Sequence, residues 1–273
     1  MSDAWLELEG LQMRFQGLMA LGDVSFGVPK GSITSVIGPN GAGKTTLFNC
    51  IAGMYRPTAG SVRFDGQDIT GFRPPQIARR GIARTFQNLA LFTGLTVLEN
   101  LLVGSYLQGR SGLLQGMFRS GRSRREQAES QAAAHAILGF LGMEALADAL
   151  PGELPYGQQK QVEFARALMQ EARLVLLDEP MAGMSSAEKS DMTQLILRAR
   201  QQFGVSFLIV EHDIPVIMRL SDKIVVLDFG KKIAEGRPAD IQNNQAVIDA
   251  YLGAPATDAD STLQPDAGAD DGR

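Results

Sequence analysis

Alternating apolar and polar residues in the first part of the chain predict strands with one buried face. Residues 5–9 and 24–28 both follow this pattern, and turn-forming residues surround them. A period of two places successive side chains on opposite faces of a strand. Residues 61–64 form a further short strand, and the Asp65-Gly66 pair behind them favours a tight hairpin turn. We therefore predict an antiparallel β layer near the N-terminus.

Continuous apolar runs predict a second set of strands, buried on both faces. These runs are residues 32–37, 174–177 and 205–210, and the last two each follow a predicted helix. Apolar strands that alternate with helices are typical of a parallel sheet covered on both sides. Residues 224–227 and 232–234 flank a predicted hairpin turn at 229–231, so the sheet is expected to be mixed but mainly parallel.

Residues 88–150 have a different character, and we predict a helical lobe there. Residues 126–150 are rich in alanine, and Ile137, Leu138 and Leu141 recur at helical spacing. Just before them, the apolar residues of 113–118 adjoin a cluster of arginines between 119 and 125. This segment either touches a membrane-embedded partner or lipid headgroups, or folds back on the lobe, and the sequence leaves both interpretations open.

Composition indicates an ordinary soluble globular protein, with 44% hydrophobic and 21% charged residues. The formal charge of -4 arises in the tail, because residues 254–273 carry five aspartates and one arginine and the remainder carries 25 residues of each sign. A neutral body lacks the basic footprint of a nucleic-acid-binding protein, so no nucleic-acid partner is expected. The acidic tail has few apolar residues to bury, and we predict that it is disordered.

The cysteine content and the N-terminus indicate a cytoplasmic protein. Cys50 is the one cysteine, which excludes an internal disulfide, and its neighbours Phe48 and Ile51 predict that it packs in the core. The sequence contains no long apolar stretch and no basic-then-apolar leader. Any link to a membrane is therefore expected to run through a partner.

A glycine-rich segment between the strand at 32–37 and a predicted helix at 45–54 has the features of a phosphate-binding loop. Its small residues let successive backbone N–H groups point inward, and the helix that follows adds the positive end of its dipole. Lys44 supplies a charge for the outer phosphates and Thr45 a hydroxyl for magnesium. We predict ATP and Mg²⁺ as its ligands. The predicted loop comprises Gly38, Pro39, Asn40, Gly41, Ala42, Gly43, Lys44, Thr45 and Thr46.

Polar residues follow two of the buried strands and supply the predicted catalytic groups. Asp178 is expected to hold magnesium, and Glu179 to orient or deprotonate the attacking water. His212 follows the strand at 205–210, where it can reach a γ-phosphate, whereas His135 lies in the alanine-rich helix and is expected to be structural.

Two other classes of nucleotide-binding protein are disfavoured by the same residues. A dinucleotide fold would have glycine at the position of Thr46 and has no use for Lys44. A GTPase would carry an Asn-Lys-x-Asp guanine-reading motif, and the chain contains no Asn-Lys pair.

Taken together, these residues resemble an ABC ATPase over residues 5–253. Residues 154–159 (Leu-Pro-Tyr-Gly-Gln-Gln) stand where that family usually has the signature Leu-Ser-Gly-Gly-Gln. The resemblance implies an α/β fold with a mixed, mainly parallel sheet, an antiparallel β subdomain and a helical subdomain inserted at 88–155. It also implies that Phe15 stacks on adenine, that Gln87 senses magnesium and the membrane partner, and that His212 is the switch histidine.

The signature departs from the usual form at two positions. Pro155 replaces the serine, whose hydroxyl contact to the γ-phosphate of the partner's nucleotide is lost, and Tyr156 replaces the first glycine. The resemblance then leaves Tyr156, Gly157 and Gln158, at the start of a helix, to present N–H groups to an anion.

The departures resemble one branch of the family, the ATPases of branched-chain amino acid uptake. That branch has Tyr-Gly-Gln-Gln at 156–159 and Ala-Gly-Met-Ser at 182–185, and the longer of its two ATPases has an insertion like 105–125 and an ending like 250–253. Relatives of similar sequence serve urea, amides or aromatic acids, so the cargo stays open at this point.

The resemblance further implies several partners. Two ATPase chains enclose two ATP molecules, and the second chain is either another copy or a related shorter ATPase. The ATPase pair is then expected at the cytoplasmic face of the inner membrane, bound there through two integral membrane permease subunits. A periplasmic or extracellular binding protein takes part indirectly.

Two rival functions remain on the sequence alone. One is a soluble ABC ATPase that acts on ribosomes or DNA, although the chain has neither a second module nor a long coiled coil. The other is a P-loop kinase of small molecules, which residues 158–159 and His212 disfavour.

Overall fold

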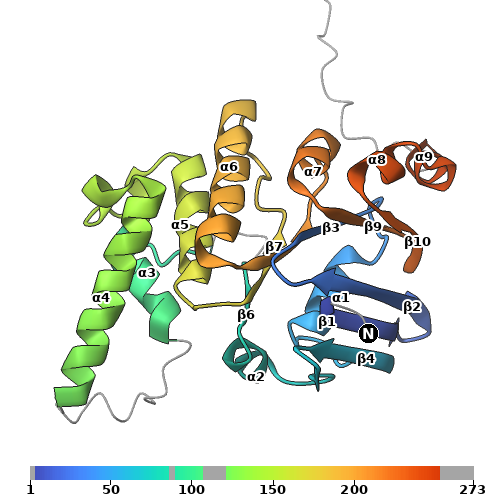
Figure 1. Ribbon diagram of the computed structural model, residues 1–273, viewed down its shortest axis with the longest axis horizontal. Coiled ribbons are helices and arrows are strands. Elements are labelled where there is room, and N and C mark those ends of the chain that lie inside the picture. Colours follow the sequence, from blue (N-terminus) through green and yellow to red (C-terminus); the bar gives the residue numbers. More distant parts are fainter. Residues whose placement is uncertain (1–3, 86–89, 107–120, 253–273) are drawn as a thin grey trace, which may run out of the picture.

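The computed structural model describes residues 4–85, 90–106 and 121–252. Predictions made for Gln87, for most of the segment 105–125 and for the tail at 254–273 lie outside these described residues. Within them, the chain forms two sheets with helices packed around the larger one (Figure 1).

The larger sheet has six strands, and all neighbouring pairs but one are parallel. β3, β8 and β7 lie in the middle, and β10 pairs antiparallel with β9 at one edge. In spatial order the strands are β10 Lys231–Gly236, β9 Lys223–Asp228, β3 Ile33–Ile37, β8 Ser206–Val210, β7 Leu174–Asp178 and β6 Ile82–Arg84. The predicted sheet, mixed but mainly parallel, is confirmed.

The central strands are buried on both faces, as their continuous apolar runs predict. Every residue of β3, β7 and β8 is buried. Along β7, Leu174 and Leu176 face the core shared with the antiparallel sheet, whereas Val175 and Leu177 face the core under the helices. Alternate residues therefore stabilise two different layers, which is why no polar residue interrupts the run before Asp178.

The antiparallel sheet is formed by β2 Leu18–Pro29, β1 Ala4–Phe15, β4 Ala59–Phe64 and β5 Gln67–Asp68, in that order. The Asp65-Gly66 turn joins β4 to β5 with φ angles of 51° and 71°, as that residue pair predicts. β1 and β2 are longer than the predicted strands because their ends, which lack a clear alternation, are held by pairing with each other.

Helices cover both faces of the large sheet. Figure 1 shows α4, α5 and α6 to one side and the antiparallel sheet with α1 to the other. The helices are α1 Lys44–Ile51, α2 Pro74–Arg79, α3 Val97–Tyr106, α4 Gly121–Leu141, α5 Tyr156–Leu168, α6 Ser186–Phe203, α7 Ile214–Leu220, α8 Pro238–Gln242 and α9 Gln245–Leu252, with 3-10 turns at Glu144–Leu146 and Pro151–Glu153. The predicted α/β class with a separate antiparallel sheet is confirmed.

Glycine accounts for two of the boundaries that differ from the sequence prediction. α1 ends at Ile51 rather than near residue 54, because Gly53 adopts a positive φ of 74° beyond the helix end. The hairpin turn of β9 and β10 contains only Phe229 and Gly230, since Lys231 already pairs with Asp228. Both turn residues have positive φ, 42° and 76°, as a two-residue hairpin requires.

Candidate functional site

The predicted phosphate loop leaves β3 at the carboxyl edge of the large sheet and leads into α1. Gly38, Gly41 and Gly43 all have positive φ. A Cβ atom on Gly38 would lie 2.1 Å from the Leu227 carbonyl oxygen, and one on Gly43 would lie 2.7 Å from that of Ala20. A Cβ atom on Gly41 would meet nothing within 4 Å. The outer two glycines therefore let the loop pack against β9 and β2, whereas the middle one serves the backbone turn alone.

A cavity of about 440 Å³ opens in front of this loop. Most of the predicted loop residues line it, together with β2 residues, the β9–β10 turn and Glu179. The complete lining is Leu18, Met19, Ala20, Asn40, Gly41, Ala42, Gly43, Lys44, Thr45, Thr46, Glu179, Phe229 and Gly230. A hollow of about 520 Å³ at the opposite edge of the sheet is more open and contains none of the predicted site residues.

Lys44 lies folded against its own loop. Its Nζ atom donates to the carbonyl oxygens of Gly38 at 2.7 Å and Pro39 at 2.9 Å, and the residue is 6% exposed. Burial lowers the pKa of the Lys44 ammonium, while the carboxylates of Glu179 and Asp178 oppose that shift. The charge is therefore held where the loop, the cavity and the two acids meet.

The two predicted acids lie at the end of β7 and have different partners. Asp178 is 2% exposed and forms an ion pair of 2.8 Å with Arg84, which also donates to Asn49 Oδ1 at 2.6 Å. Glu179 lines the cavity, and its Oε1 lies 2.7 Å from Nε2 of His212. Glu179 has a φ of 49°, a backbone conformation that non-glycine residues adopt only under constraint.

Strand register explains how Glu179 and His212 meet although they are 33 positions apart. Asp178 pairs with Val210 across the parallel β7–β8 ladder, so the residues that follow both strands emerge side by side at one edge. The sequence predicted each side chain at this edge but not their contact. Arg84 and Glu211 were not predicted as site residues. The signal for Glu211 was its place directly after a predicted strand, whereas Arg84 ends β6, a strand that the sequence did not predict.

Other predicted site residues lie away from the cavity in the single chain. Phe15 ends β1, is 37% exposed and packs edge-on against Tyr55, with ring centroids 5.3 Å apart. At the start of α5, the Tyr156 hydroxyl donates to the Ala182 carbonyl at 3.2 Å, and the Gly157 N–H donates to Glu188 Oε1 at 3.2 Å. Neither Phe15 nor the α5 residues, Gln158 included, are among those that line the cavity.

The C-terminal helix reaches the phosphate loop from the side of β10. Val247 of α9 and Ile241 of α8 share a hydrophobic cluster with Ile37, the last residue before the loop. The Gly38 N–H donates to the Tyr251 hydroxyl, and burial raises the pKa of that hydroxyl to about 12. The loop is thus held from the C-terminal side as well as by β2 and β9.

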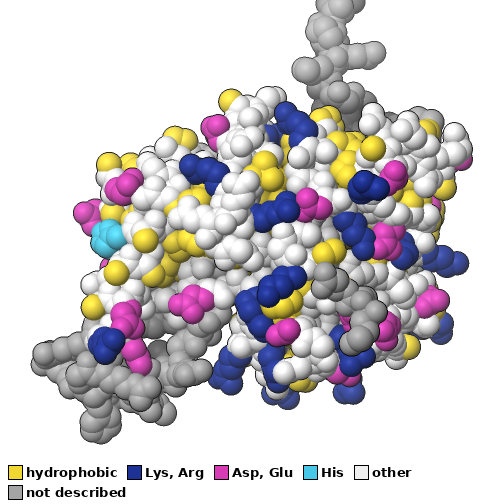
Figure 2. Space-filling model, viewed as in Figure 1, with side chains coloured by type: hydrophobic (Ala, Val, Ile, Leu, Met, Phe, Trp, Pro, Cys, Tyr) yellow, Lys and Arg dark blue, Asp and Glu magenta, His cyan; other side chains and the backbone are white. Residues whose placement is uncertain are grey.

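Several remaining features concern charge, metal binding and the membrane. Basic and acidic side chains are interspersed on the face drawn in Figure 2. Among the described residues, no group of three or more His, Cys, Asp or Glu side chains is placed to hold a metal ion by itself. None of the helices described here is both long enough and apolar enough to span a bilayer.

Two further residues discussed from the sequence are Cys50 and His135. Cys50 is buried as predicted, and burial raises the pKa of its thiol to about 12. His135, expected to be structural, is exposed on α4.

Comparison with known proteins gives matches over almost the whole chain. Residues 21–182 match the family described as ABC transporter, and residues 231–257 match the one described as branched-chain amino acid ATP-binding cassette transporter. The high-affinity branched-chain amino acid transport ATP-binding protein BraF of Pseudomonas aeruginosa is 43% identical over 93% of this chain and 99% of its own length.

Solved structures agree with these matches. An ATP-binding cassette of an ABC transporter in its ADP conformation superposes with a TM-score of 0.81 at 35% identity, covering 93% of this chain and all of the other. A dimeric post-hydrolysis ATP-binding cassette bound to ADP and Pi gives a TM-score of 0.70 at 26% identity, covering 85% and 98%. The resemblance inferred from the phosphate loop, residues 154–159 and His212 is confirmed: the chain belongs to the ATP-binding proteins of ABC transporters, in their branched-chain amino acid branch, and it binds and hydrolyses ATP to drive transport.

Proposed function

We propose that this chain powers the import of branched-chain amino acids, with the edge that joins the phosphate loop, Glu179 and His212 as its hydrolytic site. The cargo assignment is supported by relatives named for branched-chain amino acid transport, which are 41–43% identical over 93% of the chain. The assignment of the site is carried by one observation, the 2.7 Å contact between Glu179 and His212 at the mouth of the loop cavity.

The phosphate loop holds the triphosphate through its backbone N–H groups and Lys44. The Lys44 ammonium donates to two loop carbonyls, and we expect it to exchange these contacts for the outer phosphates when ATP binds. The N-terminus of α1 adds the positive end of its dipole, and its N-cap residue, Gly43, has no side chain that could cap that end.

Magnesium fits the oxygen donors at this edge. Thr45 is exposed and lines the cavity. Asp178, at the end of β7, lies within electrostatic range of Lys44, and Arg84 holds its carboxylate. Because Mg²⁺ in such sites is bound by one or two protein oxygens together with the phosphates, Thr45, Asp178 and Gln87 suffice as its protein ligands. When bound, the metal neutralises charge that develops on the transferred phosphoryl group.

Glu179 orients the attacking water and accepts its proton. The carboxylate lines the cavity, and Nε2 of His212 lies 2.7 Å from its Oε1. His212 thereby connects the acid to the end of β8, and in the ATP-bound state its ring is placed to contact the γ-phosphate.

The site requires a second chain. Phe15 is the adenine-stacking residue, while Tyr156, Gly157 and Gln158 lie away from this chain's own cavity and serve a nucleotide bound by the partner. The partner is a second copy or a related ATPase. Two integral membrane permease subunits dock this pair at the cytoplasmic face of the inner membrane, and an external binding protein delivers the cargo.

Uptake measurements in cells that lack this chain test the proposal. We expect uptake of radiolabelled leucine and valine to be lost, to return with the wild-type chain and to stay absent with Glu179→Gln. Loss of urea, amide or phenylalanine uptake with leucine uptake intact would assign the other cargo. Failure of the chain to co-purify with integral membrane subunits would favour the soluble ABC ATPase instead.

A further inference from the structure

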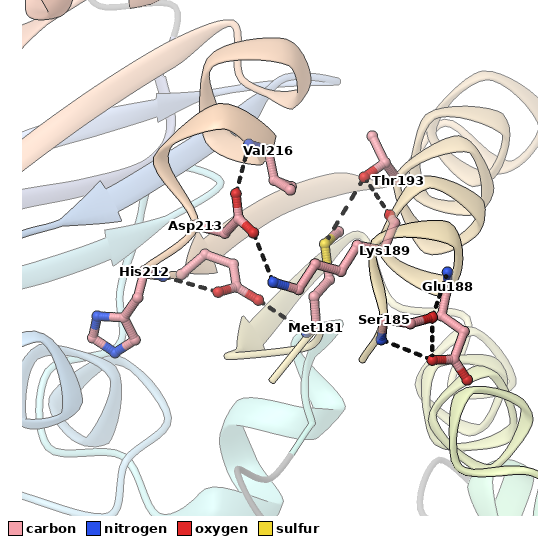
Figure 3. A network of polar contacts seen from close by, with 9 residues as sticks. Met181, Ser185, Glu188, Lys189, Thr193, His212, Asp213 and Val216 are labelled. Carbon is pink, nitrogen blue, oxygen red and sulfur yellow. Dashed lines mark hydrogen bonds and ion pairs between the residues drawn. The ribbon is translucent and has the colours of Figure 1, made fainter. Parts of the chain in front are cut away.

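One buried carboxylate joins the two loops that carry Glu179 and His212. Glu211 is the residue after β8 and is 4% exposed. Its Oε1 accepts the backbone N–H of Met181 at 2.9 Å, and its Oε2 accepts the backbone N–H of His212 at 2.8 Å. Figure 3 draws both contacts as dashed lines that start at Met181 and His212 and converge on this carboxylate.

The two N–H donors belong to different loops. Met181 is two residues after Glu179, and Pro180 between them has no N–H to offer. His212 belongs to the loop after β8. Because each oxygen of one rigid carboxylate accepts one donor, the distance between the two backbones is set by the carboxylate itself.

The turn that Glu211 holds is under strain. Glu179 has a φ of 49°, and conformations of this kind persist only where the surrounding structure over-determines them. Two backbone bonds contribute, Glu179 N–H to the Val210 carbonyl at 2.9 Å and Ala182 N–H to the Glu179 carbonyl at 3.2 Å. The Met181 N–H to Glu211 is the bond that ties this turn to the residue beside His212.

A positive charge accompanies the buried carboxylate. Lys189 of α6 lies within electrostatic range of Glu211 and forms an ion pair of 2.7 Å with Asp213. The carboxylate of Asp213 in turn caps α7 by accepting the Val216 N–H at 3.2 Å (Figure 3). The polar groups around Glu211 therefore stabilise a charged clamp inside the protein, where an unpaired carboxylate would be costly.

We propose that Glu211 is a positioning residue that sets the 2.7 Å contact between Glu179 and His212 by clamping the backbones of both loops. Glu211 is not among the described residues that line the cavity, so it acts on the chemical step through these two side chains. The inference rests on the proposed roles of Glu179 and His212.

The variant Glu211→Gln tests the clamp with almost no change of shape. Its amide has one oxygen and one NH₂ group, so one of the two N–H donors faces another donor. We expect kcat for ATP hydrolysis, measured on the chain assembled with its membrane partners, to fall about 10- to 100-fold, because misplacement of a catalytic group by about 1 Å has effects of this size. The KM for ATP should stay within about 2-fold, since Lys44 and the loop are untouched.

Two comparisons separate the clamp from a general structural role. Asp68→Asn removes a carboxylate that likewise accepts a backbone N–H, that of Thr70 at 2.8 Å, but lies in the antiparallel sheet away from both loops, and we expect its kcat within about 2-fold of wild type. Glu211→Asp keeps both acceptor oxygens on a shorter side chain and should lose less activity than Glu211→Gln; it also serves if Glu211→Gln fails to fold. Equal losses in Asp68→Asn and Glu211→Gln would overturn the proposal.

A double variant decides whether Glu211 acts through Glu179. In the Glu179→Gln background, single-turnover hydrolysis should show almost no further loss on adding Glu211→Gln, because the group that the clamp positions is already gone. The same 10- to 100-fold loss in both backgrounds would refute the clamp. Near-wild-type turnover of Glu179→Gln alone would instead refute the proposed function, so the two failures are distinguishable.

Discussion

The helices α1 and α5 both begin near residues assigned to nucleotide binding, and their N-terminal N–H groups have opposite surroundings. α1 follows Gly43, has no side-chain cap and opens on the cavity of about 440 Å³. α5 follows Pro155 and likewise has no cap from its own N-cap residue, but the Gly157 N–H is taken by Glu188 of α6. The same Glu188 side chain accepts the N–H and hydroxyl of Ser185, and these contacts with Ser185, followed by that with Gly157, lower its pKa.

This difference shows how far each helix N-terminus is ready to bind an anion within one chain. Backbone N–H groups at a helix start attract anions, and an uncapped end keeps that capacity for a ligand. At α1 the glycine turns and Lys44 leave the end open toward the cavity, with Glu179 on the far wall. At α5 the Glu188 carboxylate of the same chain already accepts a backbone N–H of the helix start. The Tyr156 hydroxyl donates to the Ala182 carbonyl. The N-terminus of α1 therefore keeps its N–H groups available for a ligand, whereas that of α5 already binds the Glu188 carboxylate.

Glu179→Gln should have the largest effect, because Glu179 is the one acidic side chain among the described residues that line the cavity. The substitution keeps the size of the side chain and a hydrogen-bonding partner for His212. We expect ATP affinity within a few-fold of wild type and turnover lower by about 10²- to 10⁴-fold, the range for loss of a general base. Phosphate release and equilibrium binding of ATP measure the two quantities. Turnover above a tenth of wild type would place the base elsewhere.

The glycines before α1 provide the next test. Gly43→Ala introduces a Cβ atom 2.7 Å from the Ala20 carbonyl at a φ of 98°, whereas Gly41→Ala adds one in open space at a φ of 81°. Both suffer backbone strain, but only the first is overpacked. We expect Gly43→Ala to lose roughly 1–3 kcal/mol more in the free energy of unfolding than Gly41→Ala, measured by denaturant unfolding without nucleotide. Equal losses would mean that contact with β2 does not shape the loop.

Gly157→Ala should have the smallest effect. It tests whether the Glu188 carboxylate can move away from the N-terminus of α5. The new Cβ atom would lie 2.5 Å from Glu188 Oε1, which is the far end of a flexible side chain. We expect the carboxylate to swing away, with a change in the free energy of unfolding below about 1 kcal/mol, because alanine favours the helix by a similar amount. Gly152→Ala, where nothing lies within 4 Å, is the matched control. A loss above roughly 2 kcal/mol relative to that control would show that Glu188 is fixed in place.

The comparison also shows which parts of the site sequence reasoning reached. The sequence singled out the whole loop at 38–46 because phosphate binding depends on local backbone geometry, and the residues that permit that geometry are adjacent in sequence. That these residues hold phosphate stays a prediction. The contact between Glu188 and Gly157 joins residues 31 positions apart on different helices, and no local sequence pattern predicts it. The strand β6 was missed for a related reason: its three residues are too few for a period, and pairing with β7 creates it.

The amino-acid sequence by itself determined the class of fold, the phosphate loop, and the acidic and histidine residues at the strand ends. Each depends on a short-range pattern, since a strand buried on both faces must be apolar throughout and a tight phosphate loop must be rich in small residues. The tertiary structure alone decided which strand ends meet. The register of β7 against β8 brings Glu179 to His212, and Glu211 then bridges their loops, because contacts across a parallel sheet depend on pairing between distant segments.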